Sequence, residues 1–263
     1  AEFVSSLSAV SDSPQWLQKL QDEARLNLQS GGFPTQKIEN WKYTNTQKLL
    51  AEKFTFAESA QDIDLPLLED SYSLVFVDGL FTAELSNLDE LPDGIEFKTL
   101  SSAISDNADS VQAELNTAQA ENTNAFAQLN AAYLSEGAYI NISRNTVCDK
   151  ALHIINVGIS DKSVAMPRNV IVVETGAEVT VLEDYVTVGD NCVFSNAVSD
   201  IRLAKNATLH HIKNQSQNLA SYHVSRINIK QERDSSYNST VFACGSLMSR
   251  SDINAELNDE NAS

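Results

Sequence analysis

Apolar side chains recur three or four positions apart near the start of the chain, at Trp16, Leu17, Leu20, Ala24 and Leu28. This spacing predicts a helix of about four turns that buries one face. Ser13 is suited to the N-cap and Pro14 to the first helical position, and Gly31-Gly32 ends the run. The segment that follows, residues 32–44, is expected to form a loop with a short helix, anchored by Trp41 and Tyr43.

The rest of the first half contains one hairpin pattern and one helical stretch. Two apolar runs flank Asp78-Gly79, which predicts a β-hairpin and makes Asp78 a turn residue rather than an acid catalyst. Residues 100–134 are rich in Ala, Gln, Asn and Leu, which predicts two helices rather than one. Breaks can fall at residues 106–109 and 121–123. The second helix is expected to bury Phe126, Leu129 and Tyr133.

From residue 137 onward the chain repeats. Four segments that each begin with isoleucine can be superimposed, at Ile171, Ile201, Ile227 and Ile253, with intervals of 30, 26 and 26 residues. Each copy has a β-type run, a polar turn and a small residue that opens a second β-type run. A period of this size built from strands and turns predicts a β-solenoid, in which each coil covers the hydrophobic face of its neighbour. A β-sandwich with similar hairpins is the competing fold.

The repeat also constrains the histidines. His210 and His211 are neighbours on a predicted strand, so their side chains point to opposite faces and make a poor metal pair. Superposition of the copies places His210 level with Thr180 and Ser239. No metal role is predicted for these two histidines or for His153 and His223.

Charge is divided unevenly along the 263 residues, whose 36 acidic and 18 basic side chains give a formal charge of −18. Residues 1–135 hold 21 acids and 7 bases (net −14), whereas residues 136–263 hold 15 acids and 11 bases (net −4). This shift predicts an N-terminal helical and mixed domain over 1–135 and a solenoid domain over 136–263. The shortage of bases argues against a nucleic-acid partner. No apolar stretch approaches the roughly 18–20 residues of a membrane span.

Three cysteines, Cys148, Cys192 and Cys244, are too few and too widely spaced for a disulfide scaffold or a C-x-x-C metal site. We expect them to be buried free thiols in a cytoplasmic protein. If each repeat forms one coil, Cys192 and Cys244 lie two coils apart. That separation is about 10 Å at the spacing of stacked strands, which exceeds the reach of a disulfide.

Signatures of self-contained catalysis are missing: the sequence has no phosphate-binding P-loop, dinucleotide fingerprint or nucleophile elbow. Adjacent acids such as Glu183-Asp184 and Asp89-Glu90 are expected by chance in so acidic a chain. Charged residues recur near matching repeat positions, at Asp200, Arg202, Arg226, Arg250 and Asp252. They keep open a carbohydrate-active solenoid enzyme, which uses carboxylates and bases on one face. A solvated charge ladder is favoured, and no catalytic, cofactor-binding or metal-ligating residue is assigned.

The segment Gly32-Phe33-Pro34-x-x-Lys37-x-Glu39-x-Trp41-Lys42-Tyr43-Thr44 resembles the N-terminal signature of the SufD family, components of the SUF iron–sulfur cluster assembly machinery. Further motifs similar to this family follow in order over nearly the whole chain. They are Val75-Phe76-Val77-Asp78-Gly79, Phe126-Ala127-Gln128-Leu129-Asn130-Ala131-Ala132 with Gly137, Pro167-Arg168-Asn169-Val170, Gly176-Ala177 with Glu183-Asp184-Tyr185, and Leu209-His210-His211-Ile212-Lys213.

The resemblance implies a helical N-terminal domain followed by a right-handed parallel β-helix. It also implies a non-catalytic scaffold that works with SufB-like and SufC-like subunits, the latter an ATPase, in cluster assembly and iron acquisition. A general protein-interaction solenoid is a further alternative.

Members of the family continue beyond residue 263, so the chain is expected to be an N-terminal piece truncated within the β-helix. The resemblance implies that it lacks the SufC-docking region and that it neither binds SufC nor assembles a cluster alone. No resident cofactor is expected, since a cluster would be held only transiently in the full complex. An uncapped solenoid end favours self-association.

Overall fold

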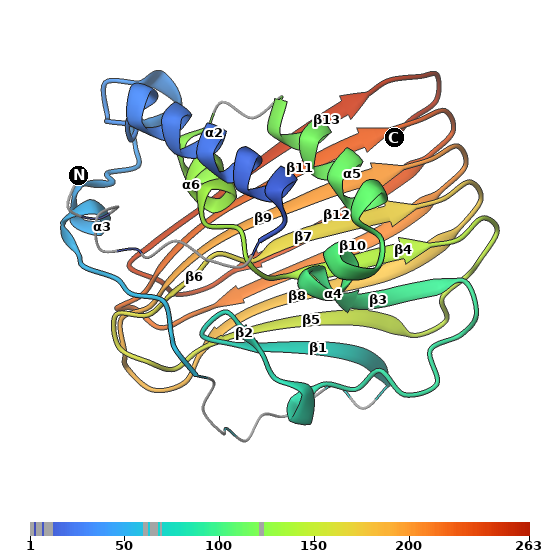
Figure 1. Cartoon of the computed structure of the whole chain (residues 1–263), viewed down its shortest axis with the longest axis horizontal. Coiled ribbons are helices and arrows are strands. Elements are labelled where there is room, and N and C mark those ends of the chain that lie inside the picture. Colours follow the sequence, from blue (N-terminus) through green and yellow to red (C-terminus); the bar gives the residue numbers. More distant parts are fainter. Residues whose placement is uncertain are drawn as a thin grey trace.

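The computed structural model describes residues 3, 7, 13–59, 63, 68, 70–120 and 124–263. Two sheets stack face to face, and helices lie across one of them (Figure 1). The sheet beneath the helices, here called the helix-covered sheet, has the spatial order β13 (Met248–Leu257), β11 (Tyr222–Gln231), β9 (Phe194–Leu203), β7 (Arg168–Val173), β4 (Ala138–Ile142) and β3 (Ile95–Thr99). The other, the outer sheet, has the order β12 (Ser236–Ala243), β10 (Thr208–Ser216), β8 (Glu178–Thr187), β5 (Ala151–Gly158), β1 (Ser71–Val77) and β2 (Leu80–Phe81).

Each sequence repeat forms one coil, with its first β-run in the helix-covered sheet and its second in the outer sheet. Strands of successive coils pair in parallel, as β9 does with β7 and with β11. The polar turn between the two runs puts one residue per coil in the left-handed backbone region, at Gly176, Asn206, Asp234 and Asn261. Gly, Asn and Asp are the residues that tolerate this conformation. The prediction of a mainly β protein with a helical N-terminal part and a parallel β-solenoid is therefore confirmed, and the β-sandwich is excluded.

The superposition of the repeats was wrong at one step. Ile171 pairs with Ile201 and Ile227 with Ile253, as expected, but Ile201 pairs with Ile229. Strand side chains alternate with a period of two, so a two-residue shift leaves the same residues facing inward. The hydrophobic pattern alone cannot detect such a shift.

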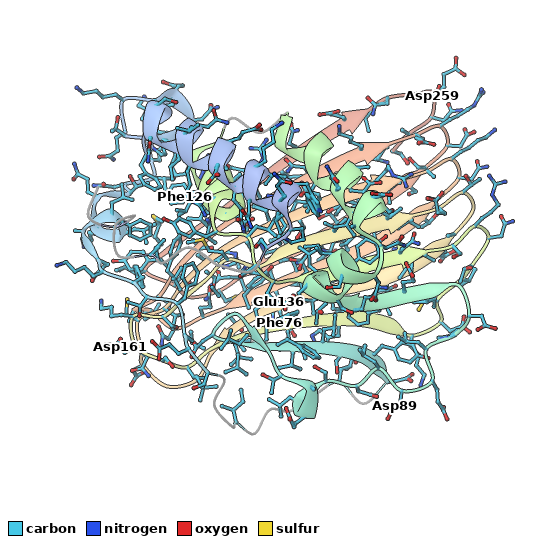
Figure 2. All side chains as sticks on the ribbon, viewed as in Figure 1. Phe76, Asp89, Phe126, Glu136, Asp161 and Asp259 are labelled. Atoms are coloured by element: carbon cyan, nitrogen blue, oxygen red, sulfur yellow. The ribbon has the colours of Figure 1, made fainter. Side chains whose placement is uncertain are left out.

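Two large apolar layers hold these elements together, and among the described residues a smaller cluster of Val75, Val77, Ile155 and Val157 joins β1 to β5. One fills the solenoid between the sheets and includes Phe76, whereas the other lies between the helices and the helix-covered sheet and includes Phe126 (Figure 2). The helical layer consists of α2 (Gln15–Gly31), α4 (Leu100–Asp106), α5 (Ala108–Ala120) and α6 (Ala125–Ala132). Shorter elements are η1 (Glu39–Trp41), α3 (Gln47–Ala51), η2 (Ala83–Leu85) and β6 (Val164–Ala165).

The first helix, α2, buries the predicted Leu17, Leu20, Ala24 and Leu28, together with Gln21. Its start is one residue later than predicted: Pro14 occupies the N-cap and makes no side-chain hydrogen bond there, so Ser13 is not the cap. Gly32 ends the helix with a positive φ of 65°, as its position predicted.

The described part of residues 100–134 forms three helices, α4, α5 and α6, where two were predicted. Asn107 interrupts the chain between α4 and α5, and the predicted break at residues 121–123 falls outside the described residues. Phe126, Leu129 and Tyr133 are buried, as predicted.

The predicted hairpin joins β1 to β2, and Asp78 occupies its turn with a φ of 49°. Strands β1–β3 extend both sheets of the solenoid, so segments on either side of residue 136 share the same two sheets. A domain boundary at residue 136 stays a prediction. Among the described residues, no helix is long and apolar enough to cross a membrane.

Candidate functional site: a polar cluster inside the solenoid and a cleft beside it

The interior of the solenoid changes from apolar to polar along the neighbouring strands β8 and β10. On β8 the inward residues Val179 and Val181 are followed by Glu183 and Tyr185, and all four are buried. On β10, Leu209 is followed in the same way by His211 and Lys213. Because inward positions alternate along a strand, the family-like motifs at residues 183–185 and 209–213 both direct two polar side chains to the inside.

Glu183 is the centre of this cluster. One carboxylate oxygen accepts a hydrogen bond from Ser199 Oγ (2.6 Å) and lies 3.1 Å from His211 Nε2, and the other accepts from the Tyr185 hydroxyl (2.8 Å). Burial alone would raise the pKa of Glu183, but the hydrogen bond and charge of His211 and the charge of Lys213 together hold it well below its ordinary value. Glu183 is therefore an ionised carboxylate that hydrogen bonds hold in a fixed position inside the protein, where it balances the positive charge of Lys213.

Lys213 is 1% exposed, and its ammonium lies 4.9 Å from the centroid of the Tyr185 ring. Burial lowers the pKa of Lys213 to about 8, in opposition to the Glu183 carboxylate, which raises it. Burial, followed by the charge of Glu183, raises the pKa of Tyr185 well above its ordinary value. The cluster thus contains an ionised carboxylate and a buried ammonium whose pKa is lowered to about 8.

His223, on β11, faces this cluster from the other sheet. Its ring packs edge-on against Tyr185 with 4.8 Å between centroids, and it is 0% exposed. Among the described residues, neither ring nitrogen has a hydrogen-bond partner. Burial, reinforced by the charge of Lys213, lowers the pKa of His223 well below 6.5. The imidazole is consequently neutral in the folded protein.

The neutral His223 makes stability depend on pH. The unfolded chain binds a proton at this residue below its ordinary pKa and the folded chain does not, so stability is intact above about pH 6.5 and falls as the pH decreases below it. We expect His223→Phe to reduce this loss of unfolding free energy between about pH 7 and pH 5.5. Stability at pH 7 should stay equal or rise, because the substitution removes an unpaired buried donor, which costs about 1–3 kcal/mol. Urea titrations at each pH measure both effects, and an unchanged pH dependence in the variant would contradict the assignment.

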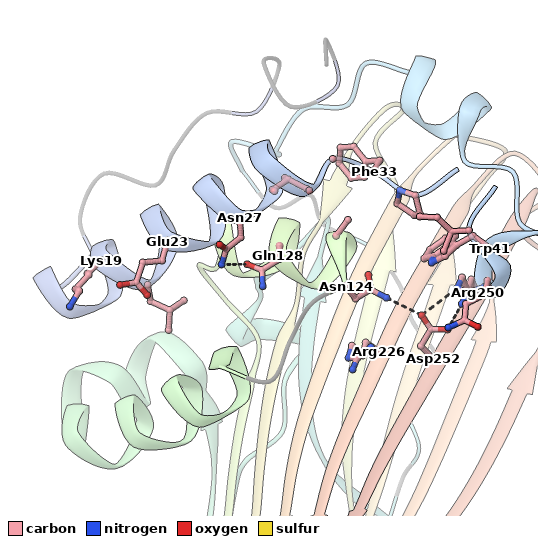
Figure 3. Close-up of a pocket in the computed structure, with 18 of the residues that line it drawn as sticks. Lys19, Glu23, Asn27, Phe33, Trp41, Asn124, Gln128, Arg226, Arg250 and Asp252 are labelled. Atoms are coloured by element: carbon pink, nitrogen blue, oxygen red, sulfur yellow. Dashed lines mark hydrogen bonds and ion pairs between the residues drawn. The ribbon is translucent and has the colours of Figure 1, made fainter. Parts of the chain in front are cut away.

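A cleft of about 1190 Å³ lies beside the solenoid, between α2, α6 and the strands β11 and β13 (Figure 3). The family signature builds one wall with Phe33, Pro34 and Trp41. Trp41 is buried between the Phe126 ring (5.4 Å between centroids) and the Arg250 guanidinium, 3.9 Å from its ring centroid. Arg250 also donates to the Asn40 carbonyl (2.9 Å), so the signature segment is attached directly to β13.

Several predicted residues lie elsewhere than expected. Tyr43 does not anchor the signature segment, since it is 91% exposed. His211 points inward and is 1% exposed whereas the side chain of His210 points outward and is 45% exposed, which confirms the opposite faces. His210 pairs with Thr180 as predicted but with Asn238 rather than Ser239.

The three cysteines are free thiols, as predicted. Cys148 is buried and Cys192 half-buried, but Cys244 is exposed, so the prediction of three buried thiols was wrong for Cys244.

The proposed charge ladder is not a continuous solvated face. Arg226 pairs in register with Asp252, but Asp200 pairs with Asn228 and Arg202 with Lys230. Asp200 and Asp252 are bound to Arg168 (2.6 Å) and Arg250 (2.7 Å), beneath the helical layer. Among the described residues, no group of three or more His, Cys, Asp or Glu is arranged to hold a metal ion.

Sequence reasoning missed the polar cluster because it treated Glu183 as a chance acid and Lys213 as part of a motif only. The available signal was the interruption of the inward apolar pattern. On β8 the inward positions become polar at Glu183, which pairs with Lys213, and on β10 they do so one inward position earlier, at His211, which pairs with Val181.

The fold and these two sites define a β-solenoid protein with a helical N-terminal layer across one sheet. The chain belongs to the SufBD family: residues 6–154 match the SufBD protein N-terminal region, and residues 153–263 match the SufBD core domain of SUF system iron–sulfur cluster assembly. The chain is 31% identical over 262 residues to the iron–sulfur cluster assembly protein SufD of Escherichia coli, covering 95% of this chain and 57% of the relative.

A SufBD family protein of Synechocystis is 30% identical over 245 residues, covering 87% of this chain and 54% of the relative. SufD of Bacillus subtilis is 26% identical over 247 residues, covering 89% and 56%. The chain therefore spans a little over half the length of these curated relatives, and the resemblance to the SufD family is confirmed.

Proposed function

We propose that the protein is a non-catalytic scaffold subunit of the SUF machinery, acting in the cytoplasm with a SufB-type subunit and a SufC-type ATPase. The iron–sulfur cluster is cargo in this role rather than a resident cofactor. The observation that carries the proposal is the uninterrupted family match, in which the N-terminal and core regions follow one another over residues 6–263.

The arrangement of charged groups supports a scaffold over a carbohydrate-active enzyme. Such an enzyme needs a carboxylate free to protonate or attack a substrate. Asp200 and Asp252 are instead held by arginines, and Glu183 is sealed inside the solenoid with three side-chain contacts.

Recovery of the protein from its own cells, with the tag on the native gene product rather than on residues 1–263 alone, tests the proposal. SufB-type and SufC-type subunits are expected to co-purify with it in stoichiometric amounts, while an unrelated acidic protein with the same tag recovers neither. Reproducible absence of both subunits would overturn the proposed function, whatever the behaviour of the cleft.

A further inference from the structure

The helix-covered sheet carries one arginine in each of four strands, and three of them are paired with carboxylates. Arg168 binds Asp200, Arg202 binds Glu114 (2.8 Å) and Glu174 (2.9 Å), and Arg250 binds Asp252. Among the described residues, the fourth, Arg226, has no acidic side chain within ion-pair distance. Its Nε donates to the Asn228 amide oxygen (2.7 Å), and the two terminal guanidinium nitrogens have no partner in the part of the chain that the structure describes.

Arg226 lies in the cleft beside β13. Figure 3 shows it beside Asn124 and Asp252, with no interaction drawn to either. Burial lowers the pKa of Arg226, in opposition to the charges of Asp252 and Asp200, which raise it. An arginine that is half-buried without an ion-pair partner loses hydration that the single hydrogen bond to Asn228 replaces only in part. The two terminal nitrogens present the forked geometry that matches a carboxylate or a phosphate.

The surroundings favour an anion as well. The charged residues that line the cleft are Lys19, Arg226 and Arg250 against Glu23 and Asp252, a local excess of one positive charge in a protein whose formal charge is −18. Trp16, also in the lining, has a buried indole N–H without a partner among the described residues. A volume of about 1190 Å³ accommodates a molecule of metabolite size.

We propose that this cleft is a binding site for a small polyanion. The two terminal guanidinium nitrogens of Arg226 hold its phosphate or carboxylate group, and Lys19 lies at the rim. This site goes beyond the scaffold role, since nothing in that role requires a small-molecule ligand. Its walls come from the signature segment, α2 and β11, so the ligand would contact both the helical layer and the solenoid.

Calorimetric titration of the chain with pyrophosphate and, separately, with citrate tests the site. We expect binding of at least one anion in the micromolar to millimolar range, and Arg226→Gln should weaken it about 10-fold or more, as expected for the loss of a hydrogen-bonded charge. Tighter binding of pyrophosphate identifies a phosphate ligand, and tighter binding of citrate a polycarboxylate.

The matched control is Arg144→Gln, the same change in charge at an exposed arginine that does not line the cleft. It should leave the affinity unchanged. Lys19→Gln, at an exposed position on α2, supplies a second variant in case Arg226→Gln fails to fold, and it should weaken binding several-fold. The inference is overturned if neither anion binds at about 10 mM, or if the control loses as much affinity as the cleft variants.

Discussion

Replacing Glu183 with alanine is expected to lower the free energy of unfolding by about 3–5 kcal/mol. The change removes the buried carboxylate but leaves Lys213 inside the solenoid as a positive charge with no counterion. It also removes the acceptor of the Ser199 and Tyr185 hydroxyls and the hydrogen-bond partner of His211 Nε2. Breaking a buried pair on one side costs much more than the pair contributes, because the remaining charge cannot regain its hydration.

Two comparisons separate this effect from simple loss of side-chain volume. Glu178→Ala, on the same strand at an exposed position, should change stability by less than about 0.5 kcal/mol. Combining Glu183→Leu with Lys213→Met removes both charges, and it should restore a large part of the stability lost in Glu183→Ala. Guanidinium unfolding followed by circular dichroism measures all three, and a double variant as unstable as the single one would rule out the charge explanation.

Gly137→Ala is expected to lower the free energy of unfolding by about 3 kcal/mol or more, and to reduce the yield of folded protein. Gly137 has a φ of 151° at the start of β4, where a Cβ atom would collide with the backbone of Arg168 in the adjacent coil. Its carbonyl accepts a hydrogen bond from the Leu100 N–H (2.7 Å), and its neighbour Glu136 accepts one from the Arg168 N–H (3.0 Å). A shift large enough to admit the methyl group would therefore disturb both the first coil and α4.

Gly31→Ala is the matched control, because nothing lies within 4 Å of a Cβ atom at this last residue of α2. Since alanine is the better helix former, stability should stay equal or rise by up to about 1 kcal/mol. Thermal unfolding of both variants distinguishes them. Equal stability of the two would show that the first coil adapts to a side chain at residue 137.

The sequence-based expectations were accurate where the interactions join residues close together in the sequence, and they failed where the interactions join residues far apart in it. The helix at residues 15–31 and the hairpin around Asp78-Gly79 depend on spacing and turn chemistry within a few residues, and both are present. The exposure of Tyr43 could not be predicted in this way. Trp41 is held by Phe126 and Arg250, which are 85 and 209 residues away in sequence, so its burial depends on contacts that local spacing does not contain.

The candidate sites show the same limit more clearly. Alternation placed His211 and His210 on opposite faces, which needs only the period of a strand. That His211 meets Glu183, and that His223 meets Tyr185 from the opposite sheet, depends on the register between coils and on how the two sheets stack. The mistaken alignment of Ile201 with Ile227 illustrates this, because two-residue shifts preserve the pattern and change every contact.

The amino-acid sequence by itself determined a repeating β-type region behind a helical N-terminal region and favoured a β-solenoid over a β-sandwich, since periodicity, turn residues and ordered motifs are local properties of the chain. The tertiary structure alone decided which charges have partners. Pairing depends on distances of a few ångströms between strands that are one coil or more apart in sequence. For that reason Glu183 proved to be a buried counterion and Arg226 an arginine without one, although both looked like ordinary surface charges in the sequence.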